Sequence, residues 1–330
     1  MIRLERIPIR WTEDLPIFAK ESFLQAVGDE YGWLGGFGET GDLRAILPFT
    51  IVRKAIFRMV RFRVETIPVG VGMDLLEETE WLGRAVDYFR SQGVDMIIPA
   101  TTNTIFRCFP DGAEAAPYGS YVIDLTPPEE ELWKKIDRIM RQNIKTALKA
   151  GVTVHEAGAR TEEAHRMIRK TFERSRLPFM TLASFQRFQG GLGEHGKLLV
   201  AEQNGVAQSF AAFGFSRSCA YAIYAGNEAA LQQGANKLLY WEAMRLFKSL
   251  GVGRYDFVGT RIDPEKGSKQ EALSQLKKRF GATLKRGFMW KYSLRHWKYR
   301  LYGLSVGLRS GGDIVDVERR RLRRAPWDAA

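Results

Sequence analysis

The sequence is poor in the residues that carry metal and covalent chemistry. Only two cysteines and four histidines occur among its 330 residues. Cys108 and Cys219 match no metal or redox spacing, and the scattered histidines form no zinc pattern. The motifs of a P-loop and of a Gly-x-Ser-x-Gly nucleophile elbow are missing as well. These absences disfavour metal-dependent and covalent catalysis, and we expect neither a cofactor nor a metal site.

Long hydrophobic runs are also missing. No stretch approaches the roughly 20 apolar residues that cross a bilayer, and charges interrupt residues 1–10, which is unlike a signal peptide. Unpaired thiols are typical of a reducing compartment. We therefore expect a cytoplasmic protein, with any membrane contact confined to the periphery of the inner face.

Acidic residues are outnumbered by basic ones. Fifty lysines and arginines face 38 aspartates and glutamates, which gives a net charge of +12. Such a field attracts nucleic acid, phosphorylated metabolites or an anionic membrane surface without choosing among them, and a generic basic surface is the plain alternative. The chain is 45% hydrophobic and long enough for two globular domains.

One pattern occurs twice in the chain. Residues 81–94 read WLGRAVDYFRSQGV and residues 239–252 read LYWEAMRLFKSLGV, at a constant offset of 158. The apolar positions follow helical spacing, and a glycine stands where a left-handed residue would end each helix. We expect a buried strand after each copy, at 95–99 and 255–258.

A hairpin precedes each copy, at residues 37–46 and 200–209, with turn-forming residues between apolar runs. A helical stretch precedes each hairpin, at 15–27 and 162–175. Helix, hairpin, helix and strand in this order resemble the GNAT N-acyltransferase fold, although chance similarity is the alternative. We predict an α/β (α+β) protein of two tandem GNAT-like domains with mixed, splayed sheets, whose gaps are natural ligand sites.

Three stretches of the second half resemble the FemABX family. They read NKLLYWEAMR at 236–245, GVGRYDFVG at 251–259 and LKKRFG at 276–281. Family members usually show a Trp-Glu-Ala helix, a Tyr-Asp-Phe-Gly-Gly strand end and a Phe-Lys-x-x-Phe-Gly-Gly segment. Residues 121–147 are similar to the helical start of the family's second domain. The likeness covers about residues 118–292, and the first half matches only in architecture.

The sequence departs from the family pattern at several positions. Val258 and Thr260 flank a single glycine where a Gly-Gly pair is usual, Leu276 replaces phenylalanine, and Ala282 replaces the second glycine of the last motif. No long heptad insertion lies within 162–195, so the coiled-coil arm of some members is missing. The chain therefore resembles the short, arm-less members, and the departures concern the acceptor more than the fold.

The resemblance implies an aminoacyltransferase. Such an enzyme would take an aminoacyl group from aminoacyl-tRNA and attach it to an amine of a peptidoglycan-precursor peptide, by direct attack without a covalent intermediate. Its partners would be the charged tRNA and a UDP-linked or lipid-linked muropeptide. Two alternatives stay open: an acyl-CoA-dependent N-acyltransferase of envelope or polysaccharide biosynthesis, and a non-catalytic scaffold that binds tRNA or membrane.

The start of the second repeated helix bears on the donor. Coenzyme A pyrophosphate is held by backbone amides at a helix start with the signature Arg/Gln-x-x-Gly-x-Gly/Ala. Residues 231–237 read LQQGANK, where Gly234 follows Gln232 by only two residues. The spacing argues against acetyl-CoA, and a degenerate coenzyme A loop is the alternative.

Lys277 and Asp256 are the candidate catalytic residues. Lys277 occupies the Phe-Lys position of the family, where a fixed ammonium would stabilise charge on the carbonyl oxygen and on the leaving ribose oxygen. Asp256 ends a strand with a buried pattern and could orient or deprotonate the attacking amine. The alternatives are a solvated lysine in the basic run 277–279 and an aspartate that caps a loop.

Candidate substrate-binding residues lie on a strand and on a helix. Tyr221 and Tyr224 alternate with Ala220, Ala222 and Ile223 and could present rings to a ligand, with core packing as the alternative. Arg138, Arg141 and Lys145 follow helical spacing and form one basic stripe that suits phosphate. A solvated helix face is the alternative for this stripe.

We expect three segments along the chain. Residues 1–120 would form the first GNAT-like domain, and residues 121–292 the second, with the Fem-like motifs. A basic segment at 293–330 would pack back on the first domain. Its run 319–324 holds five arginines in six residues and could contact tRNA phosphates or anionic lipid, with a disordered end as the alternative.

Overall fold

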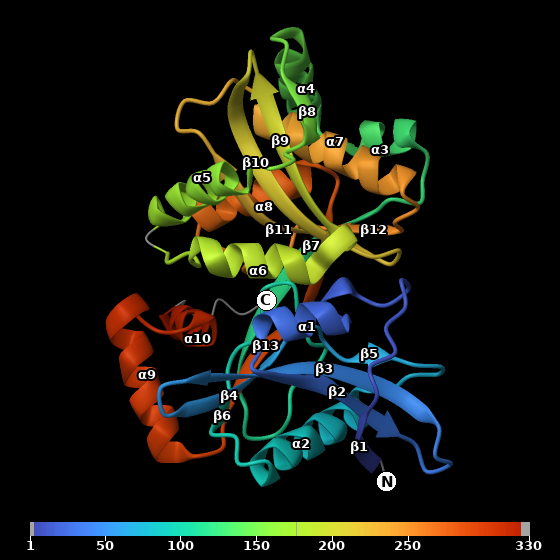
Figure 1. The fold of residues 1–330 in the computed structure, drawn as a ribbon, viewed down its shortest axis with the longest axis vertical. Helices are drawn as coiled ribbons and strands as arrows, with labels where there is room; N and C mark the ends of the chain where they lie inside the picture. Colours follow the sequence, from blue (N-terminus) through green and yellow to red (C-terminus); the bar gives the residue numbers. More distant parts are fainter. Residues whose placement is uncertain (1–2, 176, 325–330) are drawn as a thin grey trace.

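The computed structural model describes residues 3–175 and 177–324. Two α/β modules lie one above the other along the long axis of the molecule, the first in blue and cyan and the second in green to orange (Figure 1). Two red helices from the end of the chain lie beside the first module.

The first module contains six strands and three helices within the described residues. They are β1 (Arg3–Ile7), η1 (Ile17–Ala19), α1 (Glu21–Val27), β2 (Glu30–Phe37), β3 (Leu43–Lys54), β4 (Phe57–Phe62), β5 (Ile67–Pro68), α2 (Leu75–Ser91) and β6 (Met96–Ile97).

The second module and the C-terminal helices follow in chain order. They are β7 (Glu114–Asp124), α3 (Glu129–Lys135), α4 (Arg138–Lys149), β8 (Thr153–Glu156), α5 (Thr161–Glu173), α6 (Leu182–Leu192), η2 (Gly193–His195), β9 (Gly196–Gln203), β10 (Val206–Phe215), β11 (Ala220–Asn227), α7 (Ala235–Ser249), β12 (Arg254–Asp256), α8 (Lys269–Arg279), β13 (Thr283–Ser293), α9 (His296–Ser310) and α10 (Ile314–Arg324).

Both modules have the same topology. Strands β1 to β4 are antiparallel neighbours, and the chain then crosses through α2 to β6, which pairs parallel to β4. Strands β8 to β11 repeat this arrangement, and α7 leads to β12, parallel to β11. The repeated order confirms the predicted pair of tandem modules with mixed sheets.

Two long strands join the modules. β13 pairs with β7 from Thr283 to Lys291, and its last residues, Tyr292 and Ser293, pair with β6 of the first module. The domain boundary expected at residue 120 lies within β7. The two modules are therefore connected by hydrogen-bonded strands, and the division at residue 120 stays a prediction.

The repeated helices end as their sequence predicts. Gly93 and Gly251 adopt φ angles of +70° and +76° directly after α2 and α7, a left-handed conformation that glycine reaches without steric penalty. The strands that follow are shorter than the predicted spans 95–99 and 255–258. β6 has only two residues and β12 ends at Asp256, because the backbone leaves the ladder at Val258, whose φ is +48°.

The second sheet is splayed between β11 and β12. These strands share only two paired positions, Ala220 with Tyr255 and Tyr221 with Asp256. Beyond Tyr221, β11 continues beside β10 alone. The open side of the sheet therefore begins at Tyr221 and Asp256.

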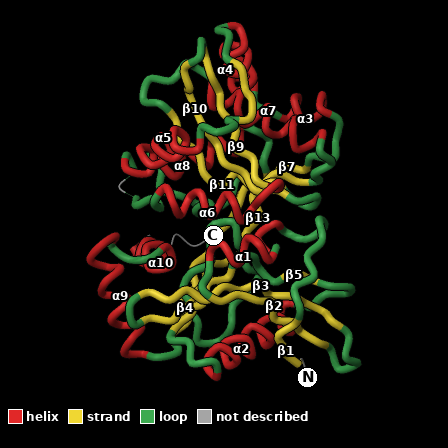
Figure 2. Tube along the Cα trace, viewed as in Figure 1, coloured by secondary structure: helices red, strands yellow, loops and turns green. Residues whose placement is uncertain are grey.

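The C-terminal helices pack on the first module (Figure 2). Tyr299 and Tyr302 of α9 lie against a buried cluster of Met59, Met96 and Ile98, and Val315 of α10 is fully buried. The run 319–324 lies in a helix, so the alternative of a disordered end is wrong there. Residues 325–330 of the expected basic segment lie outside the described residues. Among the helices that the structure describes, none is long and apolar enough to cross a membrane.

Candidate active site

The candidate catalytic residues meet where the second sheet opens. Asp256 is the last residue of β12, and Tyr221 is its paired neighbour on β11. Lys277 reaches the same region from α8, because its Nζ donates hydrogen bonds to the carbonyl oxygens of Val258 (2.6 Å) and Gly259 (3.0 Å). The sequence motifs at 251–259 and 276–281 therefore converge on one turn.

Lys277 is a buried lysine. The residue is only 9% exposed. The alternative of a solvated lysine in the basic run 277–279 therefore does not hold. Burial lowers the pKa of Lys277 to about 8, although the nearby Asp256 opposes this shift. A lysine ammonium carries three N–H donors, and two of them bind the backbone carbonyls. The third N–H has no hydrogen-bond partner among the described residues.

Asp256 is held by its own turn. Its Oδ1 accepts hydrogen bonds from the hydroxyl of Ser120 and from the backbone N–H of Val258 (2.7 Å). The residue is 5% exposed, and burial raises the pKa of its carboxyl group. The loop-capping alternative is therefore seen in the structure, and the carboxylate also lies close enough to Lys277 to favour its charged form.

Val258 explains why a glycine is usual at its position. Its φ of +48° lies in the left-handed region, which a β-branched residue rarely adopts. The turn aims the Val258 carbonyl at Lys277 and the Val258 N–H at Asp256. Backbone strain at this point thus accompanies the pairing of the two candidate catalytic residues.

A β-bulge puts Tyr221 and Tyr224 on one face. The register between β10 and β11 skips Ile223, so β11 carries one extra residue there. An extra residue reverses the alternation of side chains, and two tyrosines three positions apart then share a face. Both contact the same apolar cluster, and Tyr221 lies 4.8 Å from Phe18 of the first module between ring centroids.

The two tyrosines have different surroundings. Tyr221 is 6% exposed, and burial raises its pKa well above the ordinary value. Tyr224 lies among phenylalanines, including Phe179 and Phe188 at 5.1 and 5.5 Å. Burial raises the pKa of Tyr224, while Arg63 and Arg61 lower it. Of the two tyrosines, Tyr224 is therefore the one that lies near positive charges of the first module.

Sequence reasoning missed Arg61 and Arg63. Arg63 is 8% exposed and is fixed by bonds from Nε to the Thr50 hydroxyl (3.0 Å) and from Nη2 to the Val27 carbonyl (2.7 Å). Its burial lowers its pKa to about 9. The Nε of Arg61 is buried without a hydrogen-bond partner, and neither arginine forms an ion pair within the described part of the chain. The available signal was two arginines at alternate positions, Arg61 within β4 and Arg63 directly after its end.

An ion pair links the first module to the rim of the site. Lys285 of β13 lies 2.6 Å from Glu65 of the first module. Lys285 lowers the pKa of Asp256 and Glu65 raises it, in addition to the larger effect of burial. Charges from both modules therefore surround the carboxylate at the open side of the sheet.

The predicted basic stripe lies elsewhere. Arg138 and Lys145 are exposed on α4, and Arg141 donates to the carbonyls of Trp133 (3.2 Å) and Lys134 (2.9 Å). Figure 1 places α4 at the end of the molecule away from the first module. Arg141 thus secures the end of α3, and the structure does not gather the stripe with the tyrosines.

In residues 3–175 and 177–324, no group of three or more His, Cys, Asp or Glu side chains is placed to hold a metal ion.

The repeated topology and the splayed sheet define the fold as a tandem pair of GNAT-like modules. The family model of the FemAB family matches residues 109–209. The matched segment is less than a third of the chain, and it begins at the start of the second module. No curated protein matches its sequence.

Three solved structures have a similar fold. The crystal structure of FemX is 15% identical with a TM-score of 0.63, covering 85% of this chain and 92% of that chain. The C-terminal domain (DUF2156) of a putative lysylphosphatidylglycerol synthetase from Agrobacterium fabrum is 12% identical with a TM-score of 0.52, covering 88% and 92%. A tandem GNAT protein from the clavulanic acid biosynthesis pathway is 9% identical with a TM-score of 0.52, covering 89% and 99%.

Proposed function

We propose that the protein transfers an aminoacyl group from aminoacyl-tRNA to an amine of a peptidoglycan-precursor peptide. The observation that carries the proposal is the buried ammonium of Lys277, which is fixed by two backbone carbonyls and has no third hydrogen-bond partner among the described residues. The match of residues 109–209 to the FemAB family model supports the aminoacyl donor and the peptide acceptor.

The reaction needs charge stabilisation more than a nucleophile on the protein. The acceptor amine attacks the ester carbon, a C–N bond forms, and the C–O bond to the ribose breaks. The proton that the amine loses ends on the released ribose hydroxyl. Lys277 stabilises the negative charge first on the carbonyl oxygen and then on the leaving oxygen, a role that fixed donors perform effectively in a site shielded from water. The remaining contribution is the positioning of both substrates.

Asp256 acts in this scheme as a positioning residue. Its carboxylate holds the N–H of Val258, and the carbonyl of Val258 holds Lys277. It also favours the charged form of the lysine. Loss of Asp256 would therefore misplace Lys277 and weaken its charge.

The start of α7 favours a donor other than coenzyme A. The N–H of Gln232 is bound to the Gln208 side chain (2.8 Å), and the N–H of Ala235 to the Gln232 carbonyl (3.0 Å). Helix α4 covers the same loop, since a Cβ at Gly234 would collide with the carbonyl of Asn143. A pyrophosphate cradle needs accessible amides, and two amides of this loop are already engaged within the protein.

Arg61 and Arg63 suit an acceptor that carries phosphate. A guanidinium group that no carboxylate neutralises is a strong partner for a phosphate group. UDP-linked and lipid-linked muropeptides both carry a diphosphate, so this pair supports either acceptor. The three stripe residues Arg138, Arg141 and Lys145 remain candidates for contact with the tRNA backbone.

Calorimetric titration of the purified protein separates the donors. We expect no heat from acetyl-CoA and salt-dependent binding of charged tRNA, because tRNA contacts release counterions. Micromolar binding of acetyl-CoA would contradict the tRNA donor. The Lys277→Ala variant tests the scaffold alternative. If this variant still binds tRNA but loses turnover, the protein is not a non-catalytic scaffold.

A further inference from the structure

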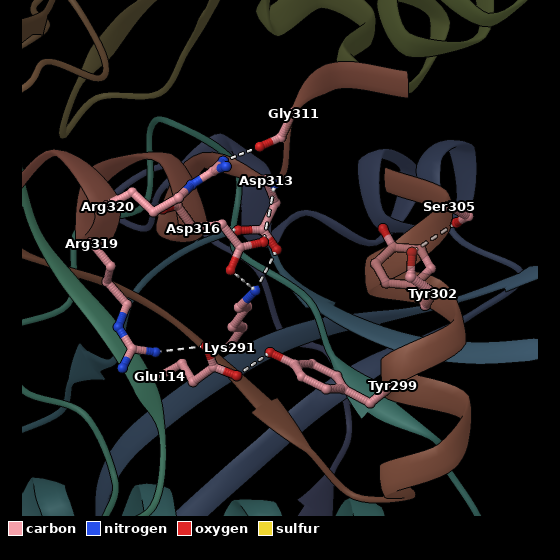
Figure 3. Close-up of polar contacts among 10 residues, drawn as sticks. All are labelled: Glu114, Lys291, Tyr299, Tyr302, Ser305, Gly311, Asp313, Asp316, Arg319 and Arg320. Atoms are coloured by element: carbon pink, nitrogen blue, oxygen red, sulfur yellow. Dashed lines mark hydrogen bonds and ion pairs between the residues drawn. The ribbon is translucent and has the colours of Figure 1, made fainter. Parts of the chain in front are cut away.

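A buried polar network fixes the C-terminal helices to the sheet (Figure 3). Lys291 of β13 binds Asp313 (3.0 Å) and Asp316 (2.5 Å), and its side chain is only 7% exposed. Glu114 of β7 accepts hydrogen bonds from Tyr299 (2.6 Å) and Arg319 (2.6 Å). These ion pairs and hydrogen bonds therefore join α9, α10 and the turn between them to strands β7 and β13.

The opposite face of α9 carries a line of large apolar residues. We name this line the α9 stripe: Trp297, Leu301, Leu304 and Leu308, which are 61%, 46%, 67% and 90% exposed. The spacing of three and four residues places them on one side of the helix. The other side already packs through Tyr299 and Tyr302. The stripe is thus an apolar face with no partner in the described chain, which usually marks an interaction surface.

Unpaired cations border the stripe. Arg300 and Arg323 are exposed and form no ion pair within the described residues. A groove of about 480 Å³ beside the stripe is lined by glycines, by the carboxylates of Glu114 and Asp316, and by three arginines, Arg319, Arg320 and Arg323. Residues 293–330 hold nine basic and four acidic residues. The apolar face is therefore set in a positive field.

A turn of the first module extends this surface. Ile56, between β3 and β4, is 54% exposed. Its carbonyl accepts a hydrogen bond from Lys298 at the start of α9 (2.7 Å), which places the turn beside Trp297. The neighbouring Lys54 is exposed. Apolar and basic side chains from two separate elements thus continue one surface.

We propose that the α9 stripe docks the protein on an anionic lipid bilayer. The apolar side chains would enter the boundary between headgroups and acyl chains, and the flanking arginines would face lipid phosphates, as in interfacial amphipathic helices. Tryptophan at one end of the stripe suits this boundary. The surface is independent of the proposed aminoacyl transfer, which takes place at the opening of the second sheet.

The charges favour lipid over a second copy of the chain. A symmetric dimer through the stripe would bring the same patch of each copy together. Arg300 and Arg323 would then face their own counterparts, and like charges across an interface oppose association. Anionic headgroups instead neutralise the same arginines.

Vesicle co-sedimentation of the full chain tests the proposal. The vesicles contain equal parts phosphatidylglycerol and phosphatidylcholine, with pure phosphatidylcholine in parallel. The variant is Leu304→Ser with Leu308→Ser, and the control is Leu76→Ser, an 83% exposed leucine of α2. We expect the double variant to lose at least tenfold in partition to the anionic vesicles, the control to bind as the wild type does, and pure phosphatidylcholine to bind weakly.

Three results would overturn the proposal. The first is that the wild type does not bind anionic vesicles. The second is that the double variant binds as well as the wild type, which would mean that basic residues across the whole surface, and not the α9 stripe, cause the binding. The third is a dimer in sedimentation without lipid that the double variant abolishes, which would make a second copy the occupant. Unchanged thermal unfolding of both variants confirms that they fold, and transfer to a soluble UDP-linked acceptor should be unchanged in the double variant.

Discussion

Lys277 shows how a single residue is tuned by its surroundings. Its position followed from a short motif, but its burial and its bonds to the Val258 and Gly259 carbonyls depend on how α8 packs against the turn after β12. A buried ammonium without a paired carboxylate within bonding distance is destabilising. Such strain is common where a function requires it.

Replacing Lys277 tests its role directly. We expect Lys277→Met to lower single-turnover transfer by about 10²-fold or more, because an oxyanion loses its fixed donor. The control is Lys278→Met, an exposed neighbour on the same helix, which should keep full activity. Rapid-quench kinetics with saturating substrates measures both. Equal activity of the two variants would remove Lys277 from the mechanism.

Stability and activity should both depend on pH through Lys277. Its folded pKa is about 8, against an ordinary value of 10.5. Between these values the unfolded chain binds the proton more tightly, so the free energy of unfolding rises with pH. The rise, on the order of 2–3 kcal/mol at 1.36 kcal/mol per pKa unit, should vanish in Lys277→Met. Denaturant titrations of both proteins from pH 7 to 10.5 measure it.

The same titration predicts a pH profile of the reaction. Transfer should decline above about pH 8, as Lys277 loses its charge. A profile that stays flat to pH 10 while the wild type remains folded would argue against an ammonium in the transition state.

At the scale of elements, the turn after β12 departs from the Gly-Gly pattern that the FemABX-like motif usually shows. Val258 adopts a φ of +48° where glycine is usual. The side chain also packs against an apolar cluster. Replacement by glycine would relieve the backbone strain, which stabilises the fold, but would also remove these apolar contacts, which destabilises it.

We expect Val258→Gly to change the free energy of unfolding by less than about 1 kcal/mol, because the left-handed conformation costs a β-branched residue roughly 1–2 kcal/mol. The matched control is Val154→Gly in β8, an extended strand, which should lose about 2 kcal/mol or more. Urea denaturation compares them. A larger loss at Val258 than at Val154 would show that the turn is not strained.

Features that depend on the local sequence could be predicted, whereas features that depend on which strands pair could not. The ends of α2 and α7 followed from Gly93 and Gly251, because a left-handed cap is a local choice. The bulge at Ile223 was not foreseeable, since it depends on which residues of β10 lie opposite. Alternation alone would have separated Tyr221 and Tyr224.

On the scale of the whole molecule, two arginines of the first module lie close to the candidate site of the second. Repeat matching predicted two modules, and the order of strands confirms them. The proximity of Arg61 and Arg63 to Tyr224 could not be predicted, because it depends on how β7 and β13 join the sheets. The sequence signal of a basic helix stripe led instead to α4, which lies at the far end.

The contribution of the first module can be measured. We expect Arg61→Gln to raise the KM for a muropeptide acceptor about tenfold or more, since a charged bond to phosphate is worth roughly 1.5–3 kcal/mol, and to leave the KM for charged tRNA unchanged. The control is Arg53→Gln on the same sheet, where Arg53 pairs with Glu30 at an exposed edge (2.7 Å). A rise in the tRNA KM alone would place the donor, not the acceptor, at Arg61.

The most direct measurement is mass spectrometry of the acceptor after incubation with the purified protein. Charged tRNAs and acyl-CoAs are offered separately with UDP-linked and lipid-linked muropeptides. Our account predicts that a muropeptide gains the mass of one aminoacyl residue with charged tRNA, and that Lys277→Met yields none. A gain with an acyl-CoA and none with any charged tRNA would contradict it.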